Sequence, residues 1–232
     1  IPLIHSKEGG KISKRYGDLS VKQYKNNNYL PESLINYLLR LGWGYHDKEF
    51  FTIEEAKKLF SLEGVRKSPA KFDEKKLSNL NSHYFKNLSI DVLFKIAGNY
   101  YDLKSHSKKF IEELFTTFQN RSENINEFLE NIKCVLINEE IEISDDAKET
   151  LRKADKKLID EIFLSLNSIN DWNKINIETI IKDIAKNKKL KLFLVASPIR
   201  ALITGKTFSP SIFKILELLG KEKSLKRIKK SF

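Results

Sequence analysis

The chain is poor in the residues that form disulfides, metal sites and membrane spans. Cys134 is the single cysteine among 232 residues, which excludes an internal disulfide and fits a reducing compartment. The four histidines, His5, His46, His83 and His106, are far apart, so no Cys/His cluster has metal-ligand spacing. No apolar run approaches the roughly 20 residues that cross a bilayer, and we expect no charged-then-apolar leader within this sequence. We therefore expect no metal site in this chain and no membrane association.

Methionine is absent, at position 1 as elsewhere. The first residues, Ile1-Pro2-Leu3-Ile4, have the pattern of a strand interior rather than of a chain start. We therefore expect the sequence to be a piece of a longer protein. Its hydrophobic fraction of 41% indicates a folded chain, long enough for two or three small domains.

Positive charge exceeds negative charge, and it is unevenly placed. The net charge is +6 over residues 1–90, −6 over residues 91–185 and +11 over residues 186–232. A basic end beyond an acidic middle favours a polyanion bound at two places, because phosphate contacts supply most nonspecific affinity for nucleic acid. The alternative is a general lysine bias with no partner at all.

Helical spacing and capping residues run through most of the chain. Thr52 with Glu55 forms a capping box, and Asp73, Ser107 and Ser144 are typical N-caps. The sequence predicts helices over or near residues 21–27, 31–41, 52–60, 89–97, 107–119, 122–136, 176–184, 210–220 and 224–230. It also predicts a helix that starts at Asp73 and another that starts at Ser144-Asp145-Asp146, with helical spacing continuing over residues 158–166. We expect no strand after about Ile4.

Caps and charge shifts also suggest domain boundaries near residues 88 and 150. No repeat, low-complexity linker or glycine-serine tether is present. We expect a first region at 1–88, a helical subdomain at 89–150 and a second helical subdomain at 151–232.

A basic loop stands out near the start of the chain. Lys11-Ile12-Ser13-Lys14-Arg15 lies between the pair Gly9-Gly10 and Gly17. Flanking glycines let a backbone turn tightly and approach a ligand, and clustered cations can bind phosphate. From these residues alone, a solvated surface turn is the alternative.

The loop and its surroundings resemble a known family. Lys11, Ile12, Ser13, Lys14 and Arg15 have the form of the KMSKS signature of class I aminoacyl-tRNA synthetases, with arginine in place of the last serine. The segments that carry the rest of the resemblance are 17–24, 29–43, 65–73, 80–81, 198–205 and 216–222. Together they resemble bacterial glutamyl-tRNA synthetases over nearly the whole chain, least between about residues 87 and 186.

The resemblance implies a fold and an activity. The fold would be mainly α: a remnant of the α/β catalytic domain at the N-terminus, then the KMSKS loop and a helical stem-contact region (1–88). An all-helical anticodon-binding region would follow. The parent enzyme would attach L-glutamate to glutamate tRNA in two ATP-dependent steps. It would act as a cytoplasmic monomer on tRNA, ATP and L-glutamate, with Mg²⁺ expected from the family.

The resemblance also assigns catalytic roles within the loop. Lys14 would contact the phosphates of ATP as pyrophosphate leaves, Lys11 would assist, and Ser13 would shape the loop. A cation on a closing loop would favour the transition state over bound ATP. None of the histidines fits the H-x-G-H signature that the active site also needs, so we expect this chain alone to be inactive.

Anticodon recognition is assigned to the basic end. By resemblance, Arg200, Ser209, Pro210 and Ile212 would read the first two anticodon bases, in a region where the helix after Ser209 could also bind phosphate. Arg121 would check the third base, because a guanidinium fork suits a cytosine edge. For Arg200, the alternative is an arginine that satisfies nearby carbonyl groups.

Two other functions fit the residues. One is a noncatalytic, basic, all-helical RNA-binding adaptor whose loop merely touches phosphate. The other is an all-helical protein-interaction module with a lysine bias.

Overall fold

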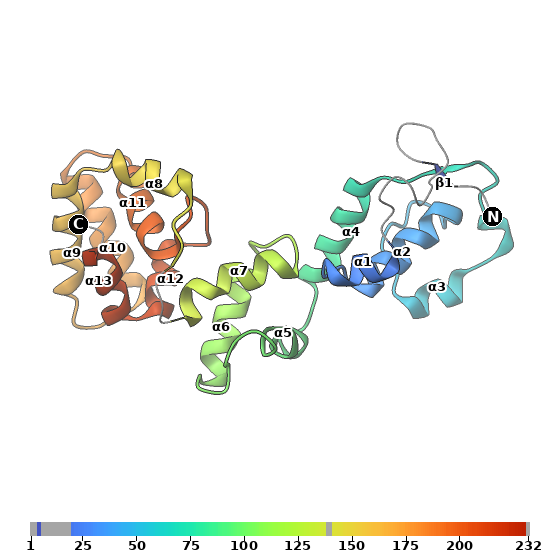
Figure 1. Cartoon of the computed structure of the whole chain (residues 1–232), viewed down its shortest axis with the longest axis horizontal. Coiled ribbons are helices and arrows are strands. Elements are labelled where there is room, and N and C mark those ends of the chain that lie inside the picture. Colours follow the sequence, from blue (N-terminus) through green and yellow to red (C-terminus); the bar gives the residue numbers. More distant parts are fainter. Residues whose placement is uncertain (1–3, 6–19, 138–140, 231–232) are drawn as a thin grey trace. The chain divides into compact units, whose positions relative to one another are not determined.

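The computed structural model describes residues 4–5, 20–137 and 141–230 (Figure 1). It divides into two compact units, Ile1–Ser89 with Ser122–Phe128, and Ile90–Arg121 with Leu129–Phe232. The predicted basic loop, Lys11 to Arg15, lies outside the described residues. The expected division into three regions remains a prediction.

The first unit is built mainly from short helices. Its elements are β1 (Ile4–His5), α1 (Val21–Asn26), α2 (Pro31–Gly42), α3 (Ile53–Leu59), the 3-10 helix η2 (Leu62–Gly64), β2 (Ala70–Lys71) and α4 (Glu74–Lys86). Pro31 stands at the first position of α2, and the predicted Thr52–Glu55 capping box opens α3. The predicted cap Asp73 accepts a hydrogen bond from the backbone N–H of Lys76.

Helices α2 and α4 pack against each other around a small core. Tyr24, Tyr37, Leu77 and Leu80 are its buried members. The hydroxyl of Tyr37 accepts a hydrogen bond from the backbone N–H of Asp73 at 2.6 Å, which joins the two helices. Apolar burial on one face of each helix, together with this hydrogen bond, therefore holds the start of α4 against α2.

One strand differs from the expectation that none follows Ile4. Strand β2 pairs in parallel with β1, with Ile4 opposite Ala70 and His5 opposite Lys71. The prediction was wrong because a strand of two residues shows no alternation of apolar and polar side chains. Strand β2 forms because it pairs with β1, which lies far away in the sequence.

The second unit is all-helical in its described part. Its elements are α5 (Ile90–Ala97), α6 (Lys108–Gln119), most of α7 (Ile125–Leu136), α8 (Asp145–Arg152), α9 (Lys156–Asn167), α10 (Lys174–Asn187), α11 (Leu192–Thr204), α12 (Ile212–Leu219) and α13 (Lys221–Lys230). The expected mainly helical fold is confirmed. Among the described residues, no helix is both long and apolar enough to cross a membrane.

Helix α11 is central to this unit. It packs against α8, α9, α10, α12 and α13 (Figure 1). Val195, Ile199 and Ile203 are fully buried along it. The sequence analysis did not predict this helix, because Pro198 lies within it and its residues are apolar all round rather than on one face.

Two helix starts differ by a few residues from those predicted. Asn173, not Asn176, caps α10: its side chain accepts from the backbone N–H of Asn176. Helix α13 begins at Lys221 rather than at Ser224, directly after Gly220 ends α12. Both shifts are within the usual error of boundaries read from caps.

Candidate nucleic-acid interface

The predicted site residues fall in three parts of the chain. Lys11, Ile12, Ser13, Lys14 and Arg15 lie outside the described residues, so their catalytic roles remain predictions. Arg200, Ser209, Pro210 and Ile212 lie in and after α11. Arg121 follows α6.

Arg200 is the centre of the basic-end group. One guanidinium nitrogen, Nη1, donates to the carbonyl oxygens of Ser209 at 3.1 Å and of Pro210 at 2.8 Å, and also to the Ser209 hydroxyl. The structure thus brings three of the four predicted residues into direct contact. The carbonyl-satisfying role that the sequence left open for Arg200 is present in the structure.

The hydrogen bonds of the Arg200 guanidinium are made by a single nitrogen. Arg200 is half-buried, and burial lowers the pKa of its guanidinium below the ordinary value. Arginine nevertheless remains charged at neutral pH. Among the described residues, Nε and Nη2 make no hydrogen bond. Nη1 therefore holds the 209–210 segment, and the donors on the other two nitrogens have no partner in the described part of the chain.

A tight turn supports this arrangement. The hydroxyl of Thr204 donates to the carbonyl of Arg200 at 2.8 Å and accepts from the backbone N–H of Lys206. Gly205 has φ +71°, and its carbonyl accepts from the backbone N–H of Ser144 at 2.9 Å. A Cβ at Gly205 would lie 2.1 Å from the carbonyl oxygen of Glu142. Only glycine fits this turn, which sets the path of residues 206–211.

Ile212 and Arg121 are placed differently from this group. Ile212 is the first residue of α12, and its side chain is 2% exposed, so it packs in the core. Arg121 is exposed after the C-terminus of α6, with its backbone N–H bonded to Phe118. Among the described residues, no hydrogen bond or ion pair joins Arg121 to Arg200. Their anticodon roles remain predictions.

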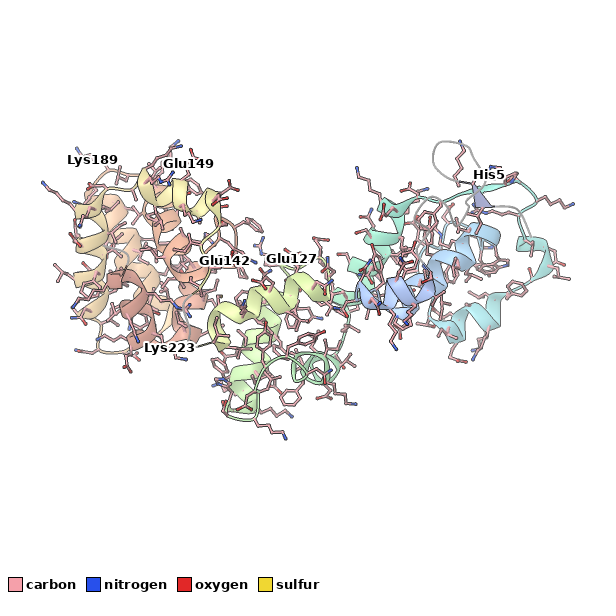
Figure 2. The ribbon with its side chains drawn as sticks, viewed as in Figure 1. His5, Glu127, Glu142, Glu149, Lys189 and Lys223 are labelled. Carbon is pink, nitrogen blue, oxygen red and sulfur yellow. The ribbon has the colours of Figure 1, made fainter. Side chains whose placement is uncertain are left out.

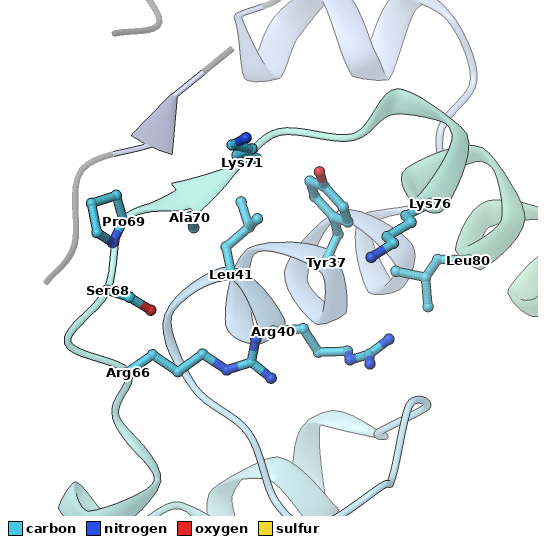
Figure 3. Close-up of a pocket in the computed structure, with 10 residues that line it drawn as sticks. All are labelled: Tyr37, Arg40, Leu41, Arg66, Ser68, Pro69, Ala70, Lys71, Lys76 and Leu80. Carbon is cyan, nitrogen blue, oxygen red and sulfur yellow. The ribbon is translucent and has the colours of Figure 1, made fainter. Parts of the chain in front are cut away.

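A second basic site, which the sequence analysis did not identify, lies in the first unit. A pocket of about 260 Å³ is lined by Tyr37, Arg40, Leu41, Arg66, Ser68, Pro69, Ala70, Lys71, Lys76 and Leu80. Figure 3 shows that these side chains come from α2, from α4, from strand β2 and from the segment between η2 and β2. No sequence pattern indicates this pocket, because the four cations that line it are spread over nearly forty positions.

Three of the four cations in this pocket have no acidic partner in the described part of the chain. Arg40 pairs with Glu49 at 3.0 Å, whereas Arg66, Lys71 and Lys76 form no ion pair there. A Cβ at Gly44 would lie 3.1 Å from Nη2 of Arg66. The guanidinium of Arg66 therefore lies close to the backbone of Gly44, where no side chain is present. Unpaired cations that converge on one pocket are suited to phosphate.

The described residues contain no cluster of three or more His, Cys, Asp or Glu side chains that could hold a metal ion. The residues predicted to contact ATP are those of the loop outside the described residues.

Two protein-family models match the chain. One, described as "Anticodon binding domain", matches residues 76–232. The other, described as "tRNA synthetases class I (E and Q), catalytic domain", matches residues 1–79.

Curated relatives are similar over nearly all of the chain. "Glutamate--tRNA ligase 2" of Rickettsia felis is 41% identical over 233 residues, which is 99% of this chain and 50% of the relative. "Glutamate--tRNA ligase 1" of Rickettsia canadensis is 40% identical over 234 residues, with the same shares. The chain therefore spans about half the length of the curated relatives that it matches.

Solved structures share the fold. A glutamate tRNA ligase from Elizabethkingia meningosepticum, crystallised in complex with its amino acid, matches with a TM-score of 0.83 and 24% identity, over 99% of this chain and 50% of that one. The glutamate-tRNA synthetase of Elizabethkingia anophelis matches with a TM-score of 0.79 and 24% identity, over 99% and 49%. The resemblance predicted from the sequence is confirmed: this chain belongs to the anticodon binding domain family, and its residues 1–79 match the class I tRNA synthetase catalytic domain.

Proposed function

We propose that this chain is the tRNA-recognising part of a glutamate–tRNA ligase, which joins L-glutamate to glutamate tRNA at the expense of ATP. The observation that carries the proposal is the combination of an anticodon-binding match over residues 76–232 with 41% identity to a glutamate–tRNA ligase over 99% of the chain. The RNA-binding adaptor and the protein-interaction module are not favoured, because residues 1–79 match a catalytic domain.

In this proposal the second unit reads the anticodon. Arg200 holds the backbone of Ser209 and Pro210 and keeps further donors free, which would present hydroxyl, carbonyl and guanidinium groups to unpaired bases. Proteins recognise single-stranded loops by hydrogen bonds from groups of this kind to the edges of unpaired bases. The net charge of +11 over residues 186–232 would attract the phosphates of the loop.

The first unit would contact a stem of the same tRNA. Its pocket carries Arg66, Lys71 and Lys76 without acidic partners among the described residues, and Ser68 adds a hydroxyl. These groups recognise phosphate and sugar rather than a base sequence, so they would orient the tRNA without selecting it.

The basic loop would act in the chemical step. Lys14, with help from Lys11, would stabilise the charge that develops as pyrophosphate leaves ATP, and Ser13 would shape the loop. In the complete enzyme, Lys14→Ala should slow glutamyl-adenylate formation far more than it weakens tRNA binding. An equal loss in both would contradict this role. We further propose a cytoplasmic monomer.

The proposal is tested by binding of the full chain to three RNAs across a salt series. These are glutamate tRNA, glutamine tRNA, and glutamate tRNA with an exchanged anticodon. We expect the tightest binding to glutamate tRNA and a preference that survives added salt, because base contacts are less salt-dependent than phosphate contacts. Equal binding of all three at every salt concentration would contradict the proposal.

Variants assign the preference to the predicted residues. Arg200→Ala should reduce the preference for the natural anticodon while leaving binding to the exchanged one nearly unchanged. Arg152→Ala is the matched control, because Arg152 is an exposed arginine at the end of α8 in the same unit. If both variants behave alike, Arg200 has no role in reading the anticodon.

A further inference from the structure

Helix α11 is buried except at its first turn. Of its residues Leu192–Thr204, Phe193 and Leu194 are the exposed ones. Every other position is buried or half-buried against five neighbouring helices. The central helix of the unit therefore presents an aromatic ring to solvent at the end where it emerges from the core.

A second phenylalanine is exposed close by in the chain. Phe193 is 73% exposed and Phe208 is 69% exposed, more than any other aromatic residue in the described part of the chain. Burial of apolar area stabilises a fold by roughly 25 cal/mol per Å², and the exposed area of these two rings does not contribute to this stabilisation. Rings kept in solvent at two positions of one segment indicate a partner that covers them.

Helical spacing and one hydrogen bond relate the two phenylalanines to Arg200. Phe193, Ser197 and Arg200 are spaced i, i+4 and i+7, so they lie on one face of α11. The Ser197 hydroxyl donates to the backbone carbonyl of Phe193 at 2.6 Å. Arg200 donates to the carbonyl of Ser209, the residue that directly follows Phe208. Phe193 therefore shares a helix face with Arg200, and Phe208 is next in the chain to the residue that Arg200 binds.

Charge around these residues indicates an anionic partner. Lys189 and Lys191 precede α11, are exposed, and form no ion pair within the described residues, whereas Lys188 pairs with Glu161 at 2.6 Å. Figure 2 shows Lys189 at the outer edge of the helices. Residues 186–232 contain two acidic residues, Glu217 and Glu222. An acidic or phosphate-bearing partner is favoured.

The spacing of polar and aromatic groups separates RNA from an apolar partner. On this face of α11, Phe193 is followed by the polar residues Ser197 and Arg200, whereas a protein or lipid surface would require an extended apolar patch. The exposed apolar side chains beside Phe193 in the chain are Leu190 and Leu194. Alternating rings and hydrogen-bond donors beside free lysines are typical of surfaces that bind unpaired nucleotides, where bases stack on aromatic faces and cations contact the backbone.

We propose that Phe193 and Phe208 are stacking platforms for two unpaired bases of the anticodon loop, one on each side of the Arg200–Ser209 contact. The inference rests on the proposed function and adds the residues that supply sequence-independent affinity. Ser209, Pro210 and Arg200 select bases, while the two rings hold neighbouring bases unstacked from the loop.

The test measures binding of the full chain to an RNA hairpin that carries the anticodon arm of glutamate tRNA. Each unpaired loop base is replaced in turn by a fluorescent purine analogue. Phe193→Ala and Phe208→Ala should each weaken binding on the order of tenfold, without changing the salt dependence, because no phosphate contact is lost. Each should also abolish the fluorescence change of one particular loop position.

Matched variants distinguish stacking from folding and from simple apolar contact. Phe193→Trp should restore affinity, and Phe193→Leu should not, since leucine has no aromatic face. Tyr100→Ala is the control for loss of an exposed aromatic, because Tyr100 is 59% exposed elsewhere in the same unit. It should bind like the wild type.

The outcomes separate this inference from the proposed function. If the wild type prefers the natural anticodon but Phe193→Ala and Phe208→Ala bind as tightly as the wild type, the stacking inference alone is wrong. If Phe193→Leu binds as well as Phe193→Trp, it is also wrong. If the wild type shows no anticodon preference, the proposed function fails and the inference fails with it.

Discussion

At the scale of single residues, Gly205 determines the path of the predicted recognition segment. Its positive φ and the closeness of the Glu142 carbonyl exclude a side chain on two separate grounds. Gly220 shares only the first ground: its φ is +85°, but nothing lies within 4 Å of a built Cβ. Comparing the same substitution at the two glycines therefore distinguishes the effect of backbone strain from the effect of a steric clash.

Gly220→Ala should lower the free energy of unfolding of the second unit by about 1 kcal/mol through backbone strain alone. Gly205→Ala should lower it by about 3 kcal/mol, because the added methyl also displaces the 141–144 segment. Urea unfolding followed by tryptophan fluorescence in a Trp43→Phe background measures this, since Trp172 is then the single tryptophan. Equal losses in the two variants would mean that the Glu142 clash does not matter.

Some features of the candidate site could be predicted from the sequence at this scale, and others could not. Resemblance identified Arg200, Ser209 and Pro210, which prove to be in contact. It could not tell that one Arg200 nitrogen is used by backbone carbonyls, or that the side chain of Ile212 is buried. Phe193 was missed because it lies in an apolar run, Leu192 to Val195, that is indistinguishable from core until its exposure is known.

At the scale of elements, local signals predicted most helices correctly. Caps such as Thr52, Asp73, Ser107 and Ser144 accept the hydrogen bonds expected of them. Elements fixed by distant contacts were the ones missed: β2 exists through its pairing with β1, and α11 is apolar all round because five helices surround it. Such contacts leave no periodic pattern in the sequence.

Arg227 joins three elements of the second unit. From α13, its Nη1 donates to the carbonyls of Cys134 in α7, at 2.6 Å, and of Ile203 in α11, at 2.9 Å. Burial lowers the pKa of this guanidinium below the ordinary value, and arginine still stays charged. Its removal would leave these helix-end carbonyls without a donor.

Arg227→Met should therefore cost about 2–4 kcal/mol of unfolding free energy, the range for buried acceptors that lose a charged donor. Arg227→Lys should restore part of it. Lys226→Met is the control, because Lys226 is exposed on the same helix. Trp172 fluorescence during urea unfolding reports the result; a loss no larger than that of the control would show that the carbonyl contacts contribute nothing.

Glu217 links α12 to two other helices through its charge. It accepts from the backbone N–H of Lys174, which begins α10, at 2.8 Å, and it pairs with Lys214, which also pairs with Glu113 of α6. Burial raises the pKa of Glu217, but the hydrogen bonds from Lys214 and Lys174 outweigh burial, so the pKa lies below its ordinary 4.5. The carboxylate stabilises the fold only while it is ionised.

Because the folded-state pKa is depressed, this stabilisation is present above about pH 4.5 and is lost as the pH falls through the folded-state value. Glu217→Gln should lower the unfolding free energy by about 1 kcal/mol at neutral pH and by less in acid. Urea unfolding at a series of pH values measures the difference between the two proteins. A difference that stays constant from neutral to acidic pH would contradict the ionised role.

At the scale of the whole molecule, two basic surfaces belong to two separate compact units. One is the pocket with Arg66, Lys71 and Lys76, and the other is the segment around Arg200. Charge counted along the sequence predicted a polyanion bound at two places, but it could not locate the pocket, because the chain must fold to bring those cations together. The stem and anticodon roles of the two surfaces remain proposals.

Phosphate contacts and base contacts should respond differently to mutation. Arg66→Met or Lys76→Met should weaken binding of every tRNA by a similar factor and reduce the slope of log affinity against log salt by about 1 each. Lys58→Met is the control, since Lys58 is an exposed cation on α3 that does not line the pocket. Filter binding across a salt series gives these slopes. If a pocket variant keeps the wild-type slope, the substituted residue does not contact phosphate.

We propose that one chain holds a glutamate tRNA at a stem and at the anticodon loop. Chemical footprinting of the tRNA backbone and bases, with and without the full chain, tests it most directly. The account predicts protection of the anticodon loop together with a separate stem segment, with Arg200→Ala losing the first and Arg66→Met the second. Protection confined to the stems, with an anticodon loop as reactive as in free tRNA, would contradict it.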